Sequence, residues 1–211
     1  MDIKPIFEHL VADPALHARL LNTLSLMENT GARKISAGEH PVNVTLIVLK
    51  HAAEEHRHAY YLKKQIAKLG DDLCPDYRAE YLLDGTGSRQ YLHQLDVDVC
   101  RYLKKELGLS GRELRFAAYL LVTYAIEVRA DELYPVYQEV LDEAGSKVNV
   151  KSIILEEEGH LEEMVNQLTE HLGDWQKHAD AAVTMETHLF NRWVSALASV
   201  QQNGGFAVPS A

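Results

Sequence analysis

Apolar residues recur at helical spacing along most of the chain, and alternating strand-like patterns are almost absent. In the first part of the chain the apolar positions lie three or four residues apart: Leu16, Leu20, Leu21, Leu24 and Met27. Asp13 and Pro14 stand just before them, where an N-cap and a first-turn proline favour the start of a helix. The pattern therefore predicts a helix over residues 14–35. A second long helix is expected from residue 42 to Gly70.

Glycines and prolines divide the rest of the chain into further segments. A crossover loop is expected over residues 71–87, because three helix-breaking residues stand there: Pro75, Gly85 and Gly87. The helices expected after this loop span residues 91–107, 110–143, 148–172 and 175–202. Ser110 and Glu113 have the spacing of a capping box at the start of the longest of these, and Pro135 is expected to kink it. The pattern alone therefore predicts an all-α bundle.

The composition is that of a folded globular protein. The chain has 211 residues, of which 46% are hydrophobic and 25% charged, enough to bury a sizeable core. We expect a single helical domain over residues 1–202 and a flexible tail over residues 203–211. The longest apolar stretch, residues 116–126, is far shorter than the ~18 residues that a membrane span needs. Cys74 and Cys100 form no disulfide framework and the N-terminus has no apolar signal core, so a cytoplasmic protein is expected.

The charge balance narrows the choice of partners. The chain carries 21 Lys and Arg against 31 Asp and Glu, a formal net charge of −10. An acidic chain lacks the electrostatic attraction that drives binding to phosphate backbones, and no basic run compensates locally. Nucleic acid and anionic membrane surfaces are therefore not expected as partners.

Two Glu-x-x-His pairs stand in the middle of predicted helices. They are Glu55 with His58, and Glu157 with His160. Residues three apart project from one face of a helix, so the two side chains of each pair can reach the same metal ion. Either pair alone is also typical of a solvated helix face. Their arrangement is more informative, because each pair follows a helix that carries an isolated glutamate, Glu28 in the first half and Glu127 in the second.

Glu127 interrupts a strongly apolar run, where an unpaired buried carboxylate would be very costly. A metal ion would remove that cost, and so would an ion pair with Arg129 or Arg101. The turn at Gly145 lies nearer to the second Glu-x-x-His pair than to Glu127, so Glu132 is an alternative ligand. Four carboxylates and two imidazoles suit iron or manganese better than structural zinc, whose sites are rich in cysteine.

With these motifs, the chain resembles the ferritin-like di-iron carboxylate proteins over residues 14–172. The Glu-Glu-His-Arg-His run at residues 54–58 is similar to a ligand-bearing helix of that superfamily, and residues 156–160 form its partner. Glu127 and Tyr134 have the Glu-x6-Tyr spacing of the rubrerythrin-like branch. The resemblance implies a ferritin-like four-helix bundle, with a long crossover that contains an extra helix and with an additional C-terminal helix.

The resemblance also implies a cofactor of two iron ions, with manganese or a mixed iron and manganese pair as alternatives. The expected metal ligands are Glu28, Glu55, His58, Glu127, Glu157 and His160. Of these, Glu55 and Glu157 are the expected bridges between the ions. Three acids are candidates, by position, to orient the ligand histidines: Glu54, Glu156 and Asp131. Gly31 and Gly159 would leave space beside the metal ions for dioxygen or a substrate.

The expected function is that of a non-haem di-iron oxidoreductase that activates dioxygen or peroxide and oxidises a small organic substrate. No CxxC pair is present for a rubredoxin-type iron centre, so an external electron donor is expected. Apolar and aromatic residues on the last helix would cover a pocket or form the surface of a homodimer: Leu189, Phe190, Trp193 and Leu197. Two alternatives are iron storage or detoxification, as in bacterioferritin, and a metal-free helical interaction protein.

Overall fold

The helices predicted from the apolar pattern are present in the computed structural model, which describes residues 2–202. This part of the chain is all-helical and contains no strand. The α-helices are α1 (Lys4–Ala12), α2 (Pro14–Gly38), α3 (Leu46–Gln65), α4 (Gly85–Leu107), α5 (Gly111–Glu143), α6 (Lys151–His171) and α7 (Trp175–Gln202). Two short 3-10 helices, η1 (Ile66–Lys68) and η2 (Ala79–Tyr81), lie in the connection between α3 and α4. The tail predicted over residues 203–211 lies outside the described residues.

Capping residues fix several of the helix ends. Asp13 accepts hydrogen bonds from two backbone amides at the start of α2, as predicted. Thr45 caps α3, so the expected start at residue 42 is wrong and residues 40–45 form a loop. Asp84 caps α4, which begins at Gly85 within the predicted loop. Ser110 occupies the N-cap position of α5, but its side chain accepts no hydrogen bond from the helix, so the predicted capping box is not formed.

The first helix, α1, was not predicted, because it is only nine residues long and has no side-chain cap. Phe7 and Leu10 are fully buried on its inner face, against α2 and α5. Tertiary packing thus stabilises a segment too short to form a helix on its own.

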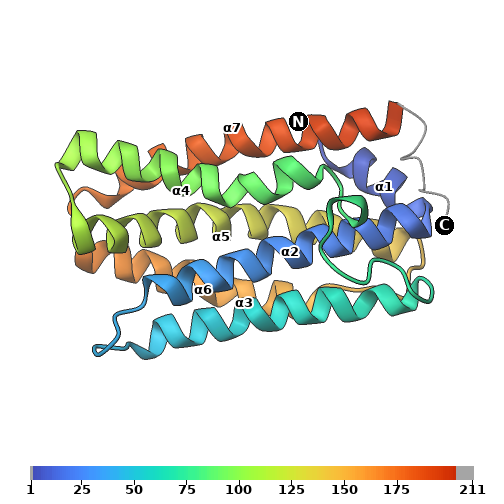
Figure 1. Cartoon of the computed structure of the whole chain (residues 1–211), viewed down its shortest axis with the longest axis horizontal. Coiled ribbons are helices and arrows are strands. Elements are labelled where there is room, and N and C mark those ends of the chain that lie inside the picture. The colour runs from blue at the N-terminus through green and yellow to red at the C-terminus, as the bar shows by residue number, and fades with distance from the viewer. Residues whose placement is uncertain (1, 203–211) are drawn as a thin grey trace.

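The long helices run side by side along the length of the molecule (Figure 1). Helix α2 forms an antiparallel hairpin with α3, and α5 forms a second hairpin with α6. Helices α4 and α7 pack against one another and against α5, and α4 also contacts α2. The two hairpins carry all the predicted metal ligands, while α4 and α7 cover one side of the pair α2 and α5. Among residues 2–202, no helix combines the length and the apolar character needed to cross a bilayer.

Helix α7 is fastened to α4 and α5 by a buried polar cluster. Glu186, which is only 1% exposed, accepts hydrogen bonds from Arg129 on α5 at 2.7 and 2.9 Å and from the Tyr91 hydroxyl on α4. The guanidinium of Arg129 also stacks on Phe190. The four apolar residues proposed for a pocket cover or a dimer surface, Leu189, Phe190, Trp193 and Leu197, are all buried within the chain. They are therefore not available as a dimer surface.

Removing the carboxylate of this cluster is expected to destabilise the protein strongly. Glu186→Ala removes the buried carboxylate that the half-buried Arg129 guanidinium and the buried Tyr91 hydroxyl share, at a cost of about 3–5 kcal/mol in the free energy of unfolding. Urea denaturation followed by circular dichroism measures this difference. The matched control is Glu132→Gln, which removes the other, 62% exposed partner of Arg129 and should cost less than ~1 kcal/mol. Equal losses in the two variants would contradict the role assigned to Glu186.

Candidate metal centre

The structure brings all six predicted ligands together inside the two hairpins. Ligand atoms of four residues lie within 4.8 Å of one another: Glu55, Glu127, Glu157 and His160. A second group of the same kind consists of Glu28, Glu55 and His58. The two groups therefore overlap, with Glu55 belonging to both. The ligands come from α2, α3, α5 and α6, and each Glu-x-x-His pair presents both of its side chains to the cluster, as the i, i+3 spacing predicts.

The cluster is a set of buried, hydrogen-bonding groups. Five of its members are buried, namely Glu55, His58, Glu127, Glu157 and His160, while Glu28 is half-buried. The Tyr134 hydroxyl donates a hydrogen bond to the Glu28 carboxylate. Four carboxylates so close together repel one another, and burial removes the water that would screen them. Positive charge placed among these acids would relieve their repulsion.

Both histidines turn the same ring atom toward the carboxylates. The Nδ1 atom of His160 lies 2.9 Å from Oε2 of Glu157 and 3.5 Å from Oε2 of Glu127. The Nδ1 atom of His58 lies 3.1 Å from Oε1 of Glu157, and it is a buried atom that has no hydrogen-bond partner among the described residues. Each oxygen of Glu157 thus faces a different histidine. Glu157 and Glu55 therefore both lie between the two halves of the cluster.

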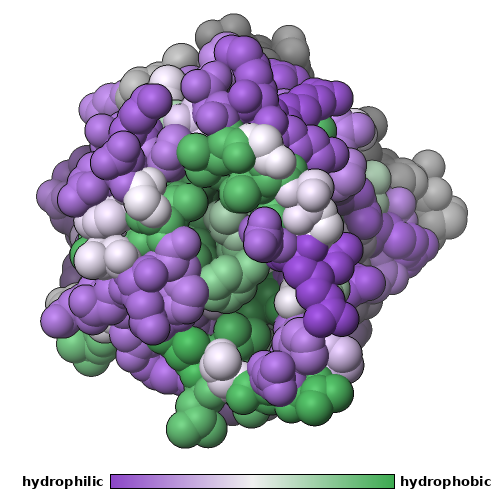
Figure 2. Space-filling model, turned by 90° about the vertical axis from the view of Figure 1, so that its left-hand side faces the viewer, coloured by the Kyte–Doolittle hydropathy of each residue, from purple (hydrophilic) through white to green (hydrophobic). Residues whose placement is uncertain are grey.

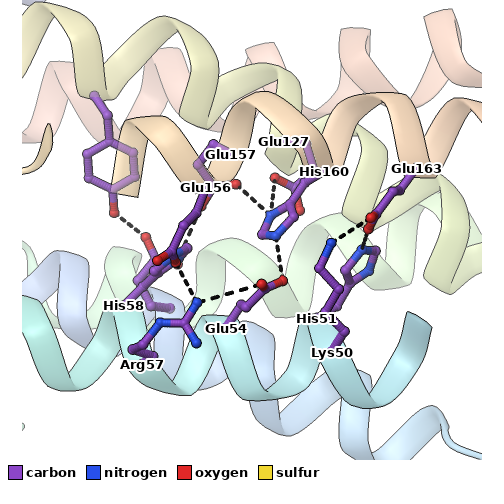
Figure 3. Close-up of polar contacts among 12 residues, drawn as sticks. Lys50, His51, Glu54, Arg57, His58, Glu127, Glu156, Glu157, His160 and Glu163 are labelled. Atoms are coloured by element: carbon purple, nitrogen blue, oxygen red, sulfur yellow. Dashed lines mark hydrogen bonds and ion pairs between the residues drawn. The ribbon is translucent and has the colours of Figure 1, made fainter. Parts of the chain in front are cut away.

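The outer ring atom of each histidine contacts a glutamate on the opposite helix, so α3 and α6 are joined in both directions (Figure 3). The Nε2 atom of His58 on α3 lies 2.8 Å from Glu156 on α6, and Nε2 of His160 on α6 lies 2.8 Å from Glu54 on α3. Arg57 donates to Glu156 at 2.6 Å and lies 3.6 Å from Glu54, so it links the two acids. When each Nε2–H is donated to a carboxylate, each Nδ1 becomes available to a metal ion once it has lost any proton of its own.

Several alternative assignments from the sequence are not supported by the packing. Asp131, a candidate to orient a histidine, lies on the exposed face of α5. Glu132 is 62% exposed and pairs with Arg129, so Glu127 is the acid that α5 contributes to the cluster. Arg129 pairs with Glu186 and Glu132, and Arg101 pairs with Asp98, so neither arginine neutralises Glu127.

The electrostatics of the metal-free cluster follow from burial and crowding. Burial, together with the neighbouring carboxylates, raises the pKa of Glu55 well above its usual value. Burial also raises the pKa of Glu127, and its hydrogen bond to Glu157 adds to the effect. Burial alone would lower the pKa of His160, but the Glu127 and Glu157 carboxylates outweigh it and raise that pKa to about 11. Without metal, the cluster therefore retains protons at positions where a cation would otherwise bind.

A third histidine of this region forms part of the surrounding network. His51 is 1% exposed, and its Nε2 lies 2.9 Å from Glu163 while its Nδ1 lies 3.3 Å from the Tyr119 hydroxyl. Its ring centre is 5.1 Å from that of His160. His51 stands four residues before Glu55, so both lie on the same face of α3, and this spacing is the feature of the sequence that indicates a position near the cluster. Its two contacts, to Glu163 and Tyr119, give it a supporting position beside the cluster.

A cavity of about 360 Å³ adjoins the cluster. It lies between α2 and α5, under α4 and α7, and Glu28, Glu55 and Glu127 form part of its wall. Exposed residues where α2 ends and α5 begins also line it, namely Ala37, Gly38 and Arg115, so the cavity opens at this end of the bundle. Figure 2 looks onto this end and shows apolar residues gathered around a hollow.

The two glycines that were expected to leave space have different positions. Gly31 lines the cavity, and a Cβ atom placed there would come within 3.5 Å of Oε2 of Glu55. The absence of a side chain at Gly31 therefore leaves the Glu55 carboxylate accessible from the cavity. Gly159 lies on the exposed face of α6 and does not line the cavity, so the expectation for it is wrong.

Comparison of the chain with protein-family models, with curated proteins and with solved structures finds no match. The assignment of a function therefore depends on the geometry of this site.

Proposed function

We propose that the chain binds two iron ions in a ferritin-like bundle and acts as a di-iron oxidoreductase on a small organic substrate. The observation that carries this proposal is the pair of overlapping ligand groups, joined by Glu55 and by the two-sided Glu157. In two-metal sites the ions lie about 3.5–4 Å apart, a separation that shared carboxylates maintain. The unpartnered Nδ1 of His58 is the orphaned buried atom that such a site would employ.

The charge and the ligand chemistry of the cluster fit divalent iron or manganese. Four carboxylates carry four negative charges when ionised, which two divalent ions would neutralise. Carboxylate oxygen and imidazole nitrogen are ligands for these metals, and among residues 2–202 the two ligand groups consist of glutamate and histidine without cysteine. Metal binding would thereby offset the cost of burying four acids at one place.

The chain's own residues would prepare the site for redox chemistry. Bound iron would supply the electrons that reduce dioxygen or peroxide, and an external donor would restore them. Glu54 and Glu156 hold the ligand histidines in the tautomer that presents Nδ1 to the metal. Tyr134 orients Glu28, the half-buried ligand at the cavity wall. The mostly apolar cavity limits the access of water and admits a substrate to one side of the cluster.

The cavity favours an organic substrate over the alternative of iron storage. Its volume of about 360 Å³ is within the range of roughly 300–1,000 Å³ typical of small-molecule sites. A site that only oxidises and passes on iron needs a polar route for ions, whereas this route is lined largely by apolar side chains such as Val122, Ile126 and Ile35.

Metal loading under controlled conditions tests the proposal. Metal-free protein is loaded anaerobically with Fe(II), desalted, analysed for iron, and then exposed to air while its near-ultraviolet absorption is recorded. We expect about two iron ions per chain and an absorption increase on oxidation. The absence of both iron and manganese binding would refute the metal site. Size-exclusion chromatography separates the alternatives, since a large hollow assembly would favour storage over the proposed oxidoreductase.

A further inference from the structure

We propose that the cavity binds an elongated apolar molecule with one anionic group, which Arg115 holds at the mouth while the apolar part points toward Glu28, Glu55 and Glu127. This assigns a substrate class to the proposed oxidoreductase and depends on that function only for the fate of the bound molecule. Binding itself requires only the cavity and its mouth.

One face of α5 carries the elements of this site in order. The residues of α5 that line the cavity recur at helical spacing, beginning with Arg115, Ala118, Tyr119, Val122, Thr123, Ile126 and Glu127. Arg115 is therefore the outermost member of a stripe whose middle is mostly apolar and which leads inward to Glu127, a candidate metal ligand. Arg115 and Glu127 are twelve residues apart, which corresponds to about 18 Å along the helix. The site is thus long and narrow rather than round.

Among the described basic residues that line the cavity, Arg115 at its mouth is the one without an acidic partner. Lys34 lines the cavity but is paired with Asp96 at 2.9 Å. Arg129, deeper inside, is engaged by Glu186 and Glu132. Arg115 is exposed, and within residues 2–202 it has no hydrogen-bond or ion-pair partner. When such a molecule enters with its apolar tail first, its carboxylate comes to lie at this free guanidinium, whose geometry suits bidentate binding of a carboxylate.

The interior would receive the apolar part of the ligand. Leu24, Ile35, Val122, Ile126, Phe190 and Trp193 contribute to its wall. An extended hydrocarbon chain advances about 1.2 Å per bond, as an extended backbone does, and would cover the distance from Arg115 to Glu127 in about 15 bonds. Straight-chain carboxylates up to about this length are therefore suitable probes. The opposite orientation would bring the anion to the acids of the inner wall, Glu28, Glu55 and Glu127, and away from Arg115.

Direct binding measurements test this proposal. Metal-free and metal-loaded protein are titrated with octanoate, decanoate, dodecanoate and dodecanol, using the fluorescence of Trp193, which lines the cavity, and calorimetry. We expect affinity to rise about fourfold per added methylene, equal to ~0.8 kcal/mol, in both forms. Arg115→Gln should weaken dodecanoate binding about three- to tenfold and leave dodecanol unchanged. The matched control is Arg112→Gln, one turn earlier on α5, where Arg112 contacts His40 and does not line the cavity.

A second variant tests the cavity mouth itself. Ala37→Trp places a large side chain at an exposed residue of the mouth, where it should not disturb the core, and should reduce binding of both dodecanoate and dodecanol at least tenfold. Carboxylate binding that needs metal and is unaffected by Arg115→Gln would overturn the proposal, because the anion would then lie on the metal. Failure of every probe to bind would overturn it too. Binding to a chain that takes up no metal would instead refute the proposed function and leave this inference intact.

Discussion

Replacing Glu55 with glutamine is expected to abolish the binding of both metal ions. Glu55 belongs to both ligand groups, so its loss removes a ligand from each ion and the bridge between them. A ligand that belonged to one group alone would affect mainly one ion. We expect the iron content to fall from about two ions per chain to nearly none, as measured by metal analysis after anaerobic loading and desalting.

The substitution separates metal binding from folding. Burial and the surrounding carboxylates raise the pKa of Glu55, which favours the neutral form of this acid in the metal-free protein, and glutamine imitates that form in size and charge. The free energy of unfolding of the metal-free protein should therefore change by less than ~1 kcal/mol. Glu132→Gln, on the exposed side of α5, is the matched control and should keep both ions. An unchanged iron content in Glu55→Gln would remove that residue from the site.

Metal affinity is expected to increase steeply with pH. Burial raises the pKa values of Glu55 and Glu127, so these acids keep their protons to a higher pH than usual, and the neighbouring carboxylates raise the pKa of His160 to about 11, so His160 is protonated at neutral pH. A metal ion binds their deprotonated forms and must displace those protons. Each displaced proton makes the apparent affinity rise about tenfold per pH unit, as long as the pH is below the raised pKa.

The protons can be counted directly. Calorimetric titration with Mn(II) at about pH 7, repeated in buffers of different ionisation enthalpy, should show the release of at least about one proton per chain when both sites fill, that of His160. The affinity measured from about pH 6 to about pH 8 should rise with a corresponding slope. An affinity independent of pH over this interval would mean that the ligands are already ionised before metal binds, contrary to the pKa shifts that burial produces here.

Much of the candidate site could be predicted because its motifs are local. The i, i+3 spacing within a helix fixes the relative positions of Glu55 and His58, and of Glu157 and His160, whatever the tertiary packing. Glu127 could be found because a charge in an apolar helix needs a partner. The helical periodicity likewise predicted six of the seven described α-helices, while their ends depended on individual caps such as Thr45 and Asp84.

The contacts between helices could not be predicted in the same way. Glu54 and Glu156 were candidates by position. Each of them binds the histidine on the opposite helix, and this pairing depends on how α3 and α6 are aligned. The same positional reasoning also proposed Asp131, which packing places on the surface. The sequence alone also allowed the apolar residues of α7 to form a dimer surface, and only the packing of α7 against α4 and α5 buries them within the chain.

The sequence by itself determined the all-helical class and the side chains that could share a metal ion, because helical periodicity and short motif spacing act within one element. Only the tertiary structure decided that four helices bring these side chains into two overlapping groups, and that a cavity connects them to an exposed Arg115. The physical reason is that the alignment of neighbouring helices results from the packing of many side chains over the whole core, which no single motif records.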